Sequence, residues 1–420
     1  MLALFPSTAR IEVGELVVGG VRATELAERF DTPLVVYCEQ TLRQRAQLFR
    51  RAAGDALVVY GTKAFASVAL LRLLAAEGLG ADVSTLGELG FARAAGLPGE
   101  SLVVHGNNKS DEELRAAAEL GALVVLDAPD EPERAAAVGV RRVLVRVTPG
   151  VDAATHAAIR TGHLGSKFGL DATMALEAVR AALAVGLDVE GLHVHVGSQL
   201  VDVAAHLLAV ERLADLAVAC RDELGWTPRV VDVGGGFGVR HVPDEPELPV
   251  EALVRDVLGA VGREWAARDL PTPRLIVEPG RALVGPAAFT LYRVGTVKEA
   301  GIRSWVAIDG GMSDNPRPQL YGARYSALLA NRADEAAVDD FAIAGKHCES
   351  GDVLIERARL PQPRRGDILA VPATGAYTLA MSSNYNSVPR PAAVFVRDGN
   401  ARLILRRETV ADLLARESER

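Results

Sequence analysis

The chain has 420 residues, of which 49% are hydrophobic and 24% are charged, and its formal net charge is -8. This length predicts two domains, and the composition excludes a disordered chain. The sequence has no long Lys/Arg block, no basic leader and no run of about eighteen apolar residues, so we expect no nucleic-acid partner, no signal peptide and no membrane span.

Cysteine and lysine are both rare. Cys38, Cys220 and Cys348 are widely spaced, which argues against a disulfide framework and a CxxC metal site. We therefore expect a cytoplasmic protein without a metal. Only five of the 46 basic residues are lysines. Because this chain uses arginine for most of its positive charges, we expect a lysine to have a role that arginine cannot fill, such as forming a Schiff base.

Two strand-like runs open the chain, at 10–21 and 33–38. Short apolar runs then alternate with Ala/Leu-rich helical patterns, as expected for parallel strands buried on both faces. These runs lie at 56–61, 80–84, 101–106, 122–127, 141–147, 191–197, 229–235 and 274–280. Eight strands with crossover helices predict an α/β fold of the (β/α)8 (TIM) barrel type, with a doubly wound sheet as the alternative.

The pattern changes after residue 281. Strand-like pieces are now separated by Gly, Pro and Asp turns without regular helices, which predicts a mainly β domain of the sandwich or barrel type. They lie at 291–297, 304–311, 366–377, 391–399 and 401–407. We therefore expect a barrel at 41–281 and a C-terminal β domain at 282–420, to which the N-terminal segment 1–40 contributes.

Several polar residues follow the barrel strands, where the active sites of such barrels lie. Lys63 follows the first run, His195 lies in the sixth and Glu278 in the last. Each of these residues alone could be a solvated side chain or a member of a simple ion pair. Because all three lie at the same end of the predicted barrel, we favour an active site. His193 precedes His195 by two residues, and we expect only one of the two imidazoles to face the barrel interior.

Three successive glycines occur in "DVGGGFG" (232–238), directly after an apolar run. They expose backbone N–H groups that suit a phosphate, although a tight turn would explain them as well. The spacing does not match the dinucleotide fingerprint. A lysine, a phosphate cradle, a histidine and a strand-end carboxylate suggest pyridoxal 5'-phosphate (PLP). Lys63 would form the Schiff base, the imidazole would stack on the ring, and Glu278 would pair with the ring nitrogen.

The chain resembles the diaminopimelate decarboxylases, PLP enzymes of the alanine-racemase-like fold group, nearly from end to end. Phe65, where many relatives have Asn, and a loose match at 126–135 depart from the pattern without touching a catalytic role. The motifs that carry the resemblance are "YGTKAF" (60–65), "GNNKS" (106–110), "THAAIRTGHLGSKFG" (155–169), "GLHVHVGSQ" (191–199), "DVGGGFG" (232–238), "EPGR" (278–281), "GGMSDNPRPQLYGARY" (310–325), "CESGD" (348–352), "GAYTLAMSSNYN" (375–386) and "RRET" (406–409).

The resemblance implies the decarboxylation of meso-2,6-diaminopimelate to L-lysine and CO2, the last step of lysine biosynthesis. It also implies a homodimer with active sites at the interface, where Cys348 and Glu349 come from the neighbouring subunit. For the cofactor it implies Lys63, His195, Ser198, Gly235, Gly236, Glu278 and Tyr377. For the substrate it implies Arg281, Arg317, Tyr321, Glu349 and Tyr377.

We interpret Cys348 as the general acid that protonates the carbanion left by decarboxylation, and Glu349 as the partner of the distal ammonium group. A buried apolar role explains Cys38 and Cys220. Two arginines suit a second substrate carboxylate, which favours diaminopimelate over ornithine, lysine, arginine or carboxynorspermidine. A catalytically silent regulatory relative is disfavoured because the lysine, the thiol and the glycines are all present. An alanine racemase would place a cation, and not Glu278, beside the ring nitrogen.

Overall fold

The computed structural model describes residues 1–151, 165–301 and 303–419, so residues 155–164 of the "THAAIRTGHLGSKFG" motif lie outside the described residues. The chain divides into two compact units. The first unit comprises Met1–Gln44, Val239–Glu247 and Leu283–Arg420, and the second comprises Arg45–Gly238 and Leu248–Ala282. Among the described residues, none of the helices has the length and apolarity that a bilayer crossing requires.

The second unit is a closed parallel barrel, and all eight predicted strands are confirmed. The pairing of β12 with β5 closes the barrel through Ile276 opposite Leu57 and Val277 opposite Val58, which rules out an open doubly wound sheet. In chain order the strands are β5 (Leu57–Gly61), β6 (Gly80–Val83), β7 (Leu102–Val104), β8 (Leu123–Leu126), β9 (Arg142–Val147), β10 (Asp188–Val194), β11 (Val230–Asp232) and β12 (Arg274–Val277).

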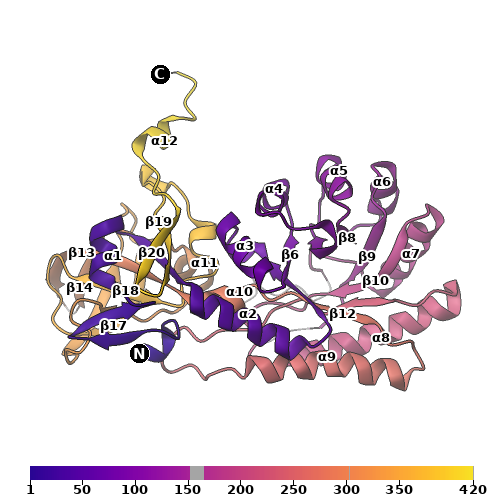
Figure 1. Ribbon diagram of the computed structural model, residues 1–420, viewed down its shortest axis with the longest axis horizontal. Coiled ribbons are helices and arrows are strands. Elements are labelled where there is room, and N and C mark those ends of the chain that lie inside the picture. Colours follow the sequence, from indigo (N-terminus) through magenta and orange to yellow (C-terminus); the bar gives the residue numbers. More distant parts are fainter. Residues whose placement is uncertain (152–164, 302, 420) are drawn as a thin grey trace. The chain divides into compact units, whose positions relative to one another are not determined.

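Helices connect the barrel strands, and successive helices contact one another around them (Figure 1). Their limits follow local signals: Ser110 and Glu113 form a capping box at the start of α5, and Gly121 ends that helix in a left-handed conformation. Helix α2 (Glu39–Ala53) precedes the first barrel strand. The connecting helices are α3 (Val68–Ala76), α4 (Leu86–Ala95), α5 (Asp111–Leu120), α6 (Glu131–Ala137), α7 (Ala172–Ala184), α8 (Ala204–Leu224) and α9 (Val250–Ala267).

The apolar residues of the strands fill the barrel interior. Val59, Val103, Leu144, Val230 and Ile276 belong to one buried cluster, to which six different strands contribute. Filling of this kind makes the barrel a packed core and leaves the carboxyl ends of the strands for polar side chains.

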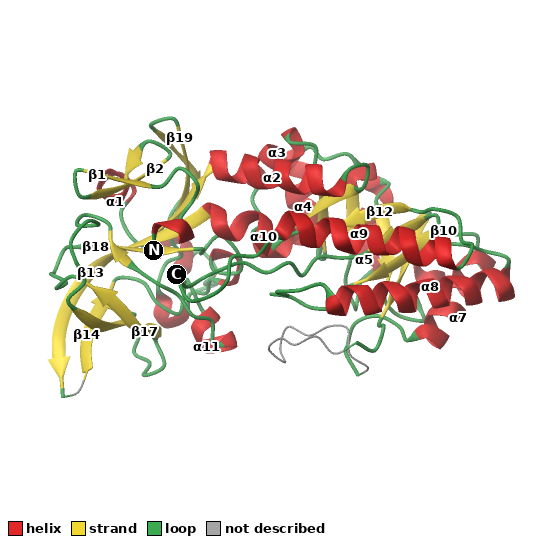
Figure 2. Ribbon diagram, turned by 90° about the horizontal axis from the view of Figure 1, so that it is seen from below, coloured by secondary structure: helices red, strands yellow, loops and turns green. Residues whose placement is uncertain are grey.

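The first unit is built on a nine-stranded sheet and is mainly β, as predicted (Figure 2). The N-terminal strand β4 (Leu34–Cys38) lies inside this sheet, antiparallel to β13 (Ala288–Ala300) and parallel to β19 (Ala392–Arg397). The other strands of the sheet are β14 (Arg303–Ile308), β15 (Leu328–Leu329), β16 (Asp339–Ala344), β17 (Val353–Leu360), β18 (Ile368–Pro372) and β20 (Asn400–Leu405). A separate small sheet holds β1 (Arg10–Glu12), β2 (Glu15–Val18) and β3 (Val21–Arg22).

Short helices complete the first unit. Helix α1 (Ala23–Phe30) precedes β4, α11 (Arg317–Tyr321) follows β14, and α12 (Val410–Leu414) lies near the C-terminus. Helix α10 (Arg281–Val284) follows the last barrel strand and crosses from the second unit to the first.

Candidate active site

Each of the eight barrel strands has an ionisable residue at or near its carboxyl end. In strand order these residues are Lys63, Asp82, His105, Asp127, Arg146, His193, Asp232 and Glu278. All except Lys63 are buried. Because the active sites of (β/α)8 barrels lie at this end, the ring of ionisable groups marks the candidate site.

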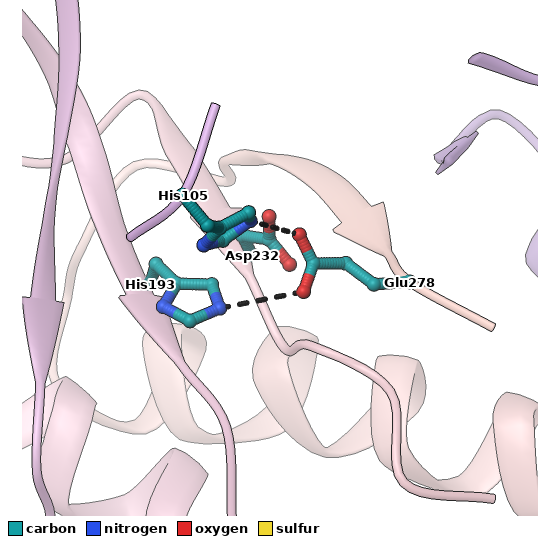
Figure 3. A group of neighbouring side chains, drawn as sticks. All are labelled: His105, His193, Asp232 and Glu278. Carbon is teal, nitrogen blue, oxygen red and sulfur yellow. Dashed lines mark hydrogen bonds and ion pairs between the residues drawn. The ribbon is translucent and has the colours of Figure 1, made fainter. Parts of the chain in front are cut away.

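The centre of the site is the carboxylate of Glu278, which points toward two imidazoles (Figure 3). His105 Nε2 lies 2.6 Å from Glu278 Oε1, and His193 Nε2 lies 3.5 Å from Glu278 Oε2. The two imidazoles also meet edge to face, with ring centroids 4.7 Å apart. Asp232 completes this buried group from the neighbouring strand β11.

The environment concentrates negative charge on Glu278. Burial alone would raise its pKa, but the interactions with His105 and His193 hold the pKa well below the usual range. Burial and the charge of Glu278 raise the pKa of Asp232 well above its ordinary value. Burial also lowers the pKa of His193 to about 3, so this imidazole is neutral at physiological pH. Burial therefore disfavours the charge on Asp232, whereas the two imidazoles favour the charge on Glu278.

Lys63 is the accessible member of the ring. Its side chain is 51% exposed, and its Nζ lies 4.0 Å from Asp82 Oδ2. Asp82 is buried, and its pKa is raised by burial, against the opposing effect of nearby His105. An amine that reaches solvent beside buried acids has the access that covalent reaction with a small molecule requires.

The three glycines after β11 are required by close backbone packing. A Cβ on Gly235 would lie 2.1 Å from the carbonyl oxygen of Glu278, and one on Gly236 would lie 2.4 Å from that of Gly197. Gly234 and Gly236 also have positive φ angles, +67° and +94°. The glycines therefore allow the ends of β10, β11 and β12 to approach one another.

This packing assembles the predicted phosphate side. The Gly235 N–H donates to His195 Nδ1 over 3.2 Å, and the Gly235 carbonyl accepts from His206 Nε2 over 2.9 Å. Arg281 NH2 donates to Ser198 Oγ over 3.1 Å, so a guanidinium lies beside the hydroxyl predicted to bind phosphate. Burial, with the charges of Lys63 and Arg146, lowers the pKa of His195 well below its usual value, which leaves its imidazole neutral.

We expected only one of His193 and His195 to face the barrel interior, and this stays a prediction. His193 contacts Glu278 inside the barrel. His195 follows the last residue of β10, so the alternation of side chains along a strand does not fix its direction.

A buried ion pair lies behind the ring. Lys109 Nζ is 3.0 Å from Glu131 Oε1, and both side chains are 1% exposed. The same ammonium donates to the carbonyls of Gly106 (2.6 Å) and Val125 (2.7 Å). Lys109 therefore ties the loop after β7 to strand β8, next to the site.

Arg146 and Asp127 form a second buried ion pair at this end, with NH1 and Oδ2 3.2 Å apart. The Arg146 guanidinium lies over the ring of Phe168, 4.6 Å from its centroid. Asp127 Oδ1 also accepts the Gly169 N–H over 2.8 Å. Arg146 thus brings a fixed positive charge to the site, where it contributes to the low pKa of His195.

The remaining predicted residues belong to the first unit. Arg317 begins α11, is 5% exposed, and places its NH1 3.1 Å from His241 Nε2. Tyr321 ends the same helix. Tyr377 has a φ of +59°, which is a strained conformation for a bulky side chain. Such strain is found at functional sites more often than elsewhere.

Cys348 and Glu349 are both exposed, whereas Cys38 and Cys220 are buried. Burial raises the pKa of the Cys220 thiol to about 12, which fits an inert side chain. A cavity of about 640 Å³ opens in the same unit, and its walls include Pro318, Gln319, Ser350 and Gly351. These residues are sequence neighbours of the predicted substrate residues.

Sequence reasoning did not select five of the buried groups at the barrel end. These are Asp82, His105, Asp127, Arg146 and Asp232. Each stands at or near the end of an apolar run, and that position is the signal that could have identified it. A polar residue at the end of a strand buried on both faces needs a partner, because an unpaired buried polar group is costly.

The residues at the barrel end fit PLP in their donor chemistry. Glu278 is a buried carboxylate held ionised, as a partner of a protonated ring nitrogen must be. Lys63 provides an amine, and Ser198 and Arg281 provide donors for a phosphate. His105, His193, Asp232 and Glu278 also have ligand atoms within 4.8 Å of one another, so this group could hold a metal ion. The absence of a metal therefore stays a prediction.

Three comparisons with known proteins all find similarity to pyridoxal-dependent decarboxylases. Residues 39–285 match the family model of the pyridoxal-dependent decarboxylases, pyridoxal binding domain. The diaminopimelate decarboxylase of Actinosynnema pretiosum subsp. auranticum is 49% identical over 99% of this chain and 95% of its own length. The diaminopimelate decarboxylase of Bacillus subtilis is 44% identical over 96% of this chain and 94% of its own length. The crystal structure of diaminopimelate decarboxylase from M. jannaschii with L-lysine has a TM-score of 0.90 at 33% identity, covering 99% of this chain and 98% of that one.

Proposed function

The chain belongs to the diaminopimelate decarboxylases, and on that premise we propose that it converts meso-2,6-diaminopimelate to L-lysine and CO2 with PLP. The observation that carries the proposal is the ionised Glu278 carboxylate, held by two imidazoles at the end of the barrel where Lys63 is accessible. When bound, PLP supplies a sink for the electron pair that remains after CO2 leaves.

We assign the cofactor to the barrel unit. Lys63 would form the covalent link to the aldehyde carbon, and His195 would lie against the ring. Ser198, Gly235 and Gly236 would hold the phosphate, and the bond from Arg281 to Ser198 supports a phosphate role for this arginine as well. Glu278 would keep the ring nitrogen protonated, because its low pKa makes it a permanent anion.

We assign the substrate and the proton transfer mainly to the first unit. Arg317 and Tyr321 on α11 would hold a substrate carboxylate, with Arg281 and Tyr377, and Glu349 would pair with the distal ammonium group. The bond from the α-carbon to the carboxylate carbon breaks, and its electron pair stays on the α-carbon. The thiol proton of Cys348 then forms the new C–H bond.

The assembly and the compartment are also proposals. We propose a homodimer in which Cys348 and Glu349 serve the active site of the neighbouring subunit. Their exposure supports this role, because in the single chain they are open to a partner. We also propose that the enzyme works in the cytoplasm, which is supported by the three free cysteines.

The test is substrate selection. Purified protein with PLP is incubated separately with meso-diaminopimelate, L-ornithine, L-lysine and L-arginine, and CO2 and product are measured. Lysine formed only from meso-diaminopimelate is the expected result, and the matched Lys63→Ala protein should release no CO2. Release from L-ornithine or L-arginine would overturn the substrate assignment of Arg317 and Glu349 while keeping the cofactor. No release from any substrate would overturn the proposal.

A further inference from the structure

One short turn of the first unit contacts three consecutive residues around the predicted acid. Tyr385 and Asn386 lie within the "GAYTLAMSSNYN" motif, and neither has a role in the function proposed above. Between them they touch His347, Cys348 and Glu349. A turn that meets three successive residues of another loop can fix how that loop is presented.

Asn386 holds the backbone of Cys348. Its side-chain Oδ1 accepts the Cys348 N–H over 3.0 Å. To reach it, Asn386 adopts φ +52° and ψ +26°, and Ser387 follows with a φ of +56°. Asparagine tolerates the left-handed region better than most residues, but two such residues in succession persist only where their surroundings determine them.

Tyr385 reaches the two neighbours of Cys348. Its ring stacks on the imidazole of His347, with centroids 5.8 Å apart and planes inclined by 17°. Its hydroxyl lies 3.5 Å from Glu349 Oε2 and is oriented to donate to it. Tyr385 therefore packs against His347 on one side of Cys348 and restricts the position of the Glu349 carboxylate on the other side.

The packing has a rigid base. The His347 side chain is fully buried, and its Nδ1 lies 2.7 Å from Asp352 Oδ2. Gly311 and Gly345 make room for this carboxylate, since a Cβ on either would come within 2.6 Å of an Asp352 oxygen. Tyr385 thus stacks on an imidazole that is itself anchored, and the exposed Cys348 and Glu349 are tied to that anchor.

We propose that Asn386 and Tyr385 are positioning residues for the reacting pair: Asn386 sets the direction of the Cys348 thiol, and Tyr385 sets that of the Glu349 carboxylate. The inference rests on the proposed roles of Cys348 and Glu349. It predicts a division of effects, in which loss of Asn386 impairs proton delivery and loss of the Tyr385 hydroxyl impairs substrate binding.

The test compares Asn386→Gly, Asn386→Asp and Tyr385→Phe in the full-length protein. Glycine accepts the left-handed conformation without strain, so it removes the acceptor and preserves the turn. Aspartate keeps an acceptor in the same place. Asn400→Ala is the control, because Asn400 is an exposed asparagine of the same unit whose side-chain amide donates to the Asp398 carbonyl.

The first measurement is the rate of iodoacetamide alkylation as a function of pH, without substrate. Cys348 is the exposed thiol and the other two are buried, so the modified position can be assigned by mass spectrometry. Asn386→Gly should change the rate about threefold or more, Asn386→Asp should alkylate more slowly at neutral pH because its negative charge disfavours the thiolate, and Asn400→Ala should match the wild type.

The second measurement is steady-state decarboxylation. Asn386→Gly should lower kcat about five- to tenfold with KM nearly unchanged, and Asn386→Asp should recover part of it. Tyr385→Phe should raise KM about fivefold with kcat nearly unchanged. The proposal would be overturned if Asn386→Gly were alkylated at the wild-type rate. It would also be overturned if Asn386→Gly and Tyr385→Phe changed kcat and KM in the same way. If the wild type releases no CO2, the proposed function fails, and the alkylation rates still decide whether Asn386 positions the thiol.

Discussion

Two groups of candidate site residues in this molecule differ sharply in burial. The groups around Glu278 are at most 7% exposed, whereas Cys348 and Glu349 are exposed on a turn of the other unit. A charge state such as that of Glu278 is maintained only where burial and fixed partners exclude water. A residue that must meet an arriving substrate cannot be covered in advance. The difference teaches that the fold fixes the charge state around Glu278 and leaves the proposed proton donor, Cys348, accessible.

The largest effect is expected at the buried ion pair behind the barrel site. Lys109→Met removes the ammonium and leaves the buried Glu131 carboxylate without a counter-charge, which should cost about 3–5 kcal/mol in the free energy of unfolding. Denaturant unfolding measures this loss. The matched control is Arg406→Met, which breaks the exposed pair with Asp412 and should leave the midpoint unchanged. Equal midpoints for the two variants would contradict the buried role.

The next effect concerns catalysis. Glu278→Gln keeps the shape of the side chain and removes its charge, so kcat should fall about 10²- to 10³-fold, as for other preorganised electrostatic contacts. The measurement is CO2 release at saturating PLP, with cofactor binding followed by absorbance to separate affinity from turnover. A loss of less than threefold would show that the ionised carboxylate does not serve the reaction.

A pH effect of intermediate size is expected from His193. Because the folded pKa is about 3 against an ordinary 6.5, the unfolded chain takes up a proton that the folded protein refuses. The stability that this group confers is present above pH 6.5 and lost as the pH falls toward 3, amounting to roughly 2–3 kcal/mol between pH 6.5 and 4.5. His193→Gln should flatten the fall in denaturation midpoint over this range. Parallel curves would contradict a buried neutral imidazole.

The smallest effect on stability is expected in the exposed group. Glu349→Gln should leave the melting temperature unchanged and raise KM for meso-diaminopimelate about tenfold, because the proposed charge-assisted contact to the distal ammonium would be lost. Steady-state kinetics and thermal unfolding on the same preparation measure both. A melting temperature lowered as much as in Lys109→Met would remove the contrast between the two groups.

The barrel was predictable because each of its strands is an apolar run, buried on both faces and followed by a helical pattern. The strands β16 and β17 were not predicted individually. β17 carries Glu356, Arg357 and Arg359 within eight residues, and this density of charge conceals a strand whose other face is buried. Its pairing with β16 depends on contacts that no local pattern contains.

The candidate site was predictable only in part, because single residues could be placed at strand ends but their pairings could not. The bond between His105 and Glu278 joins residues 173 positions apart, and barrel closure alone brings them together. The support that Asn386 gives to Cys348 depends on a left-handed backbone conformation that an asparagine permits but does not require.

The place of β4 in its sheet has a consequence for biosynthesis. This apolar strand pairs with β13 and β19, and β19 is translated roughly 350 residues later. At about 5–20 residues per second, β4 waits roughly 20–70 s for its last partner, while the whole barrel emerges in between. The barrel can therefore fold on the ribosome before the sheet exists, and the nascent chain must shield an unpaired, aggregation-prone strand near its N-terminus throughout that interval.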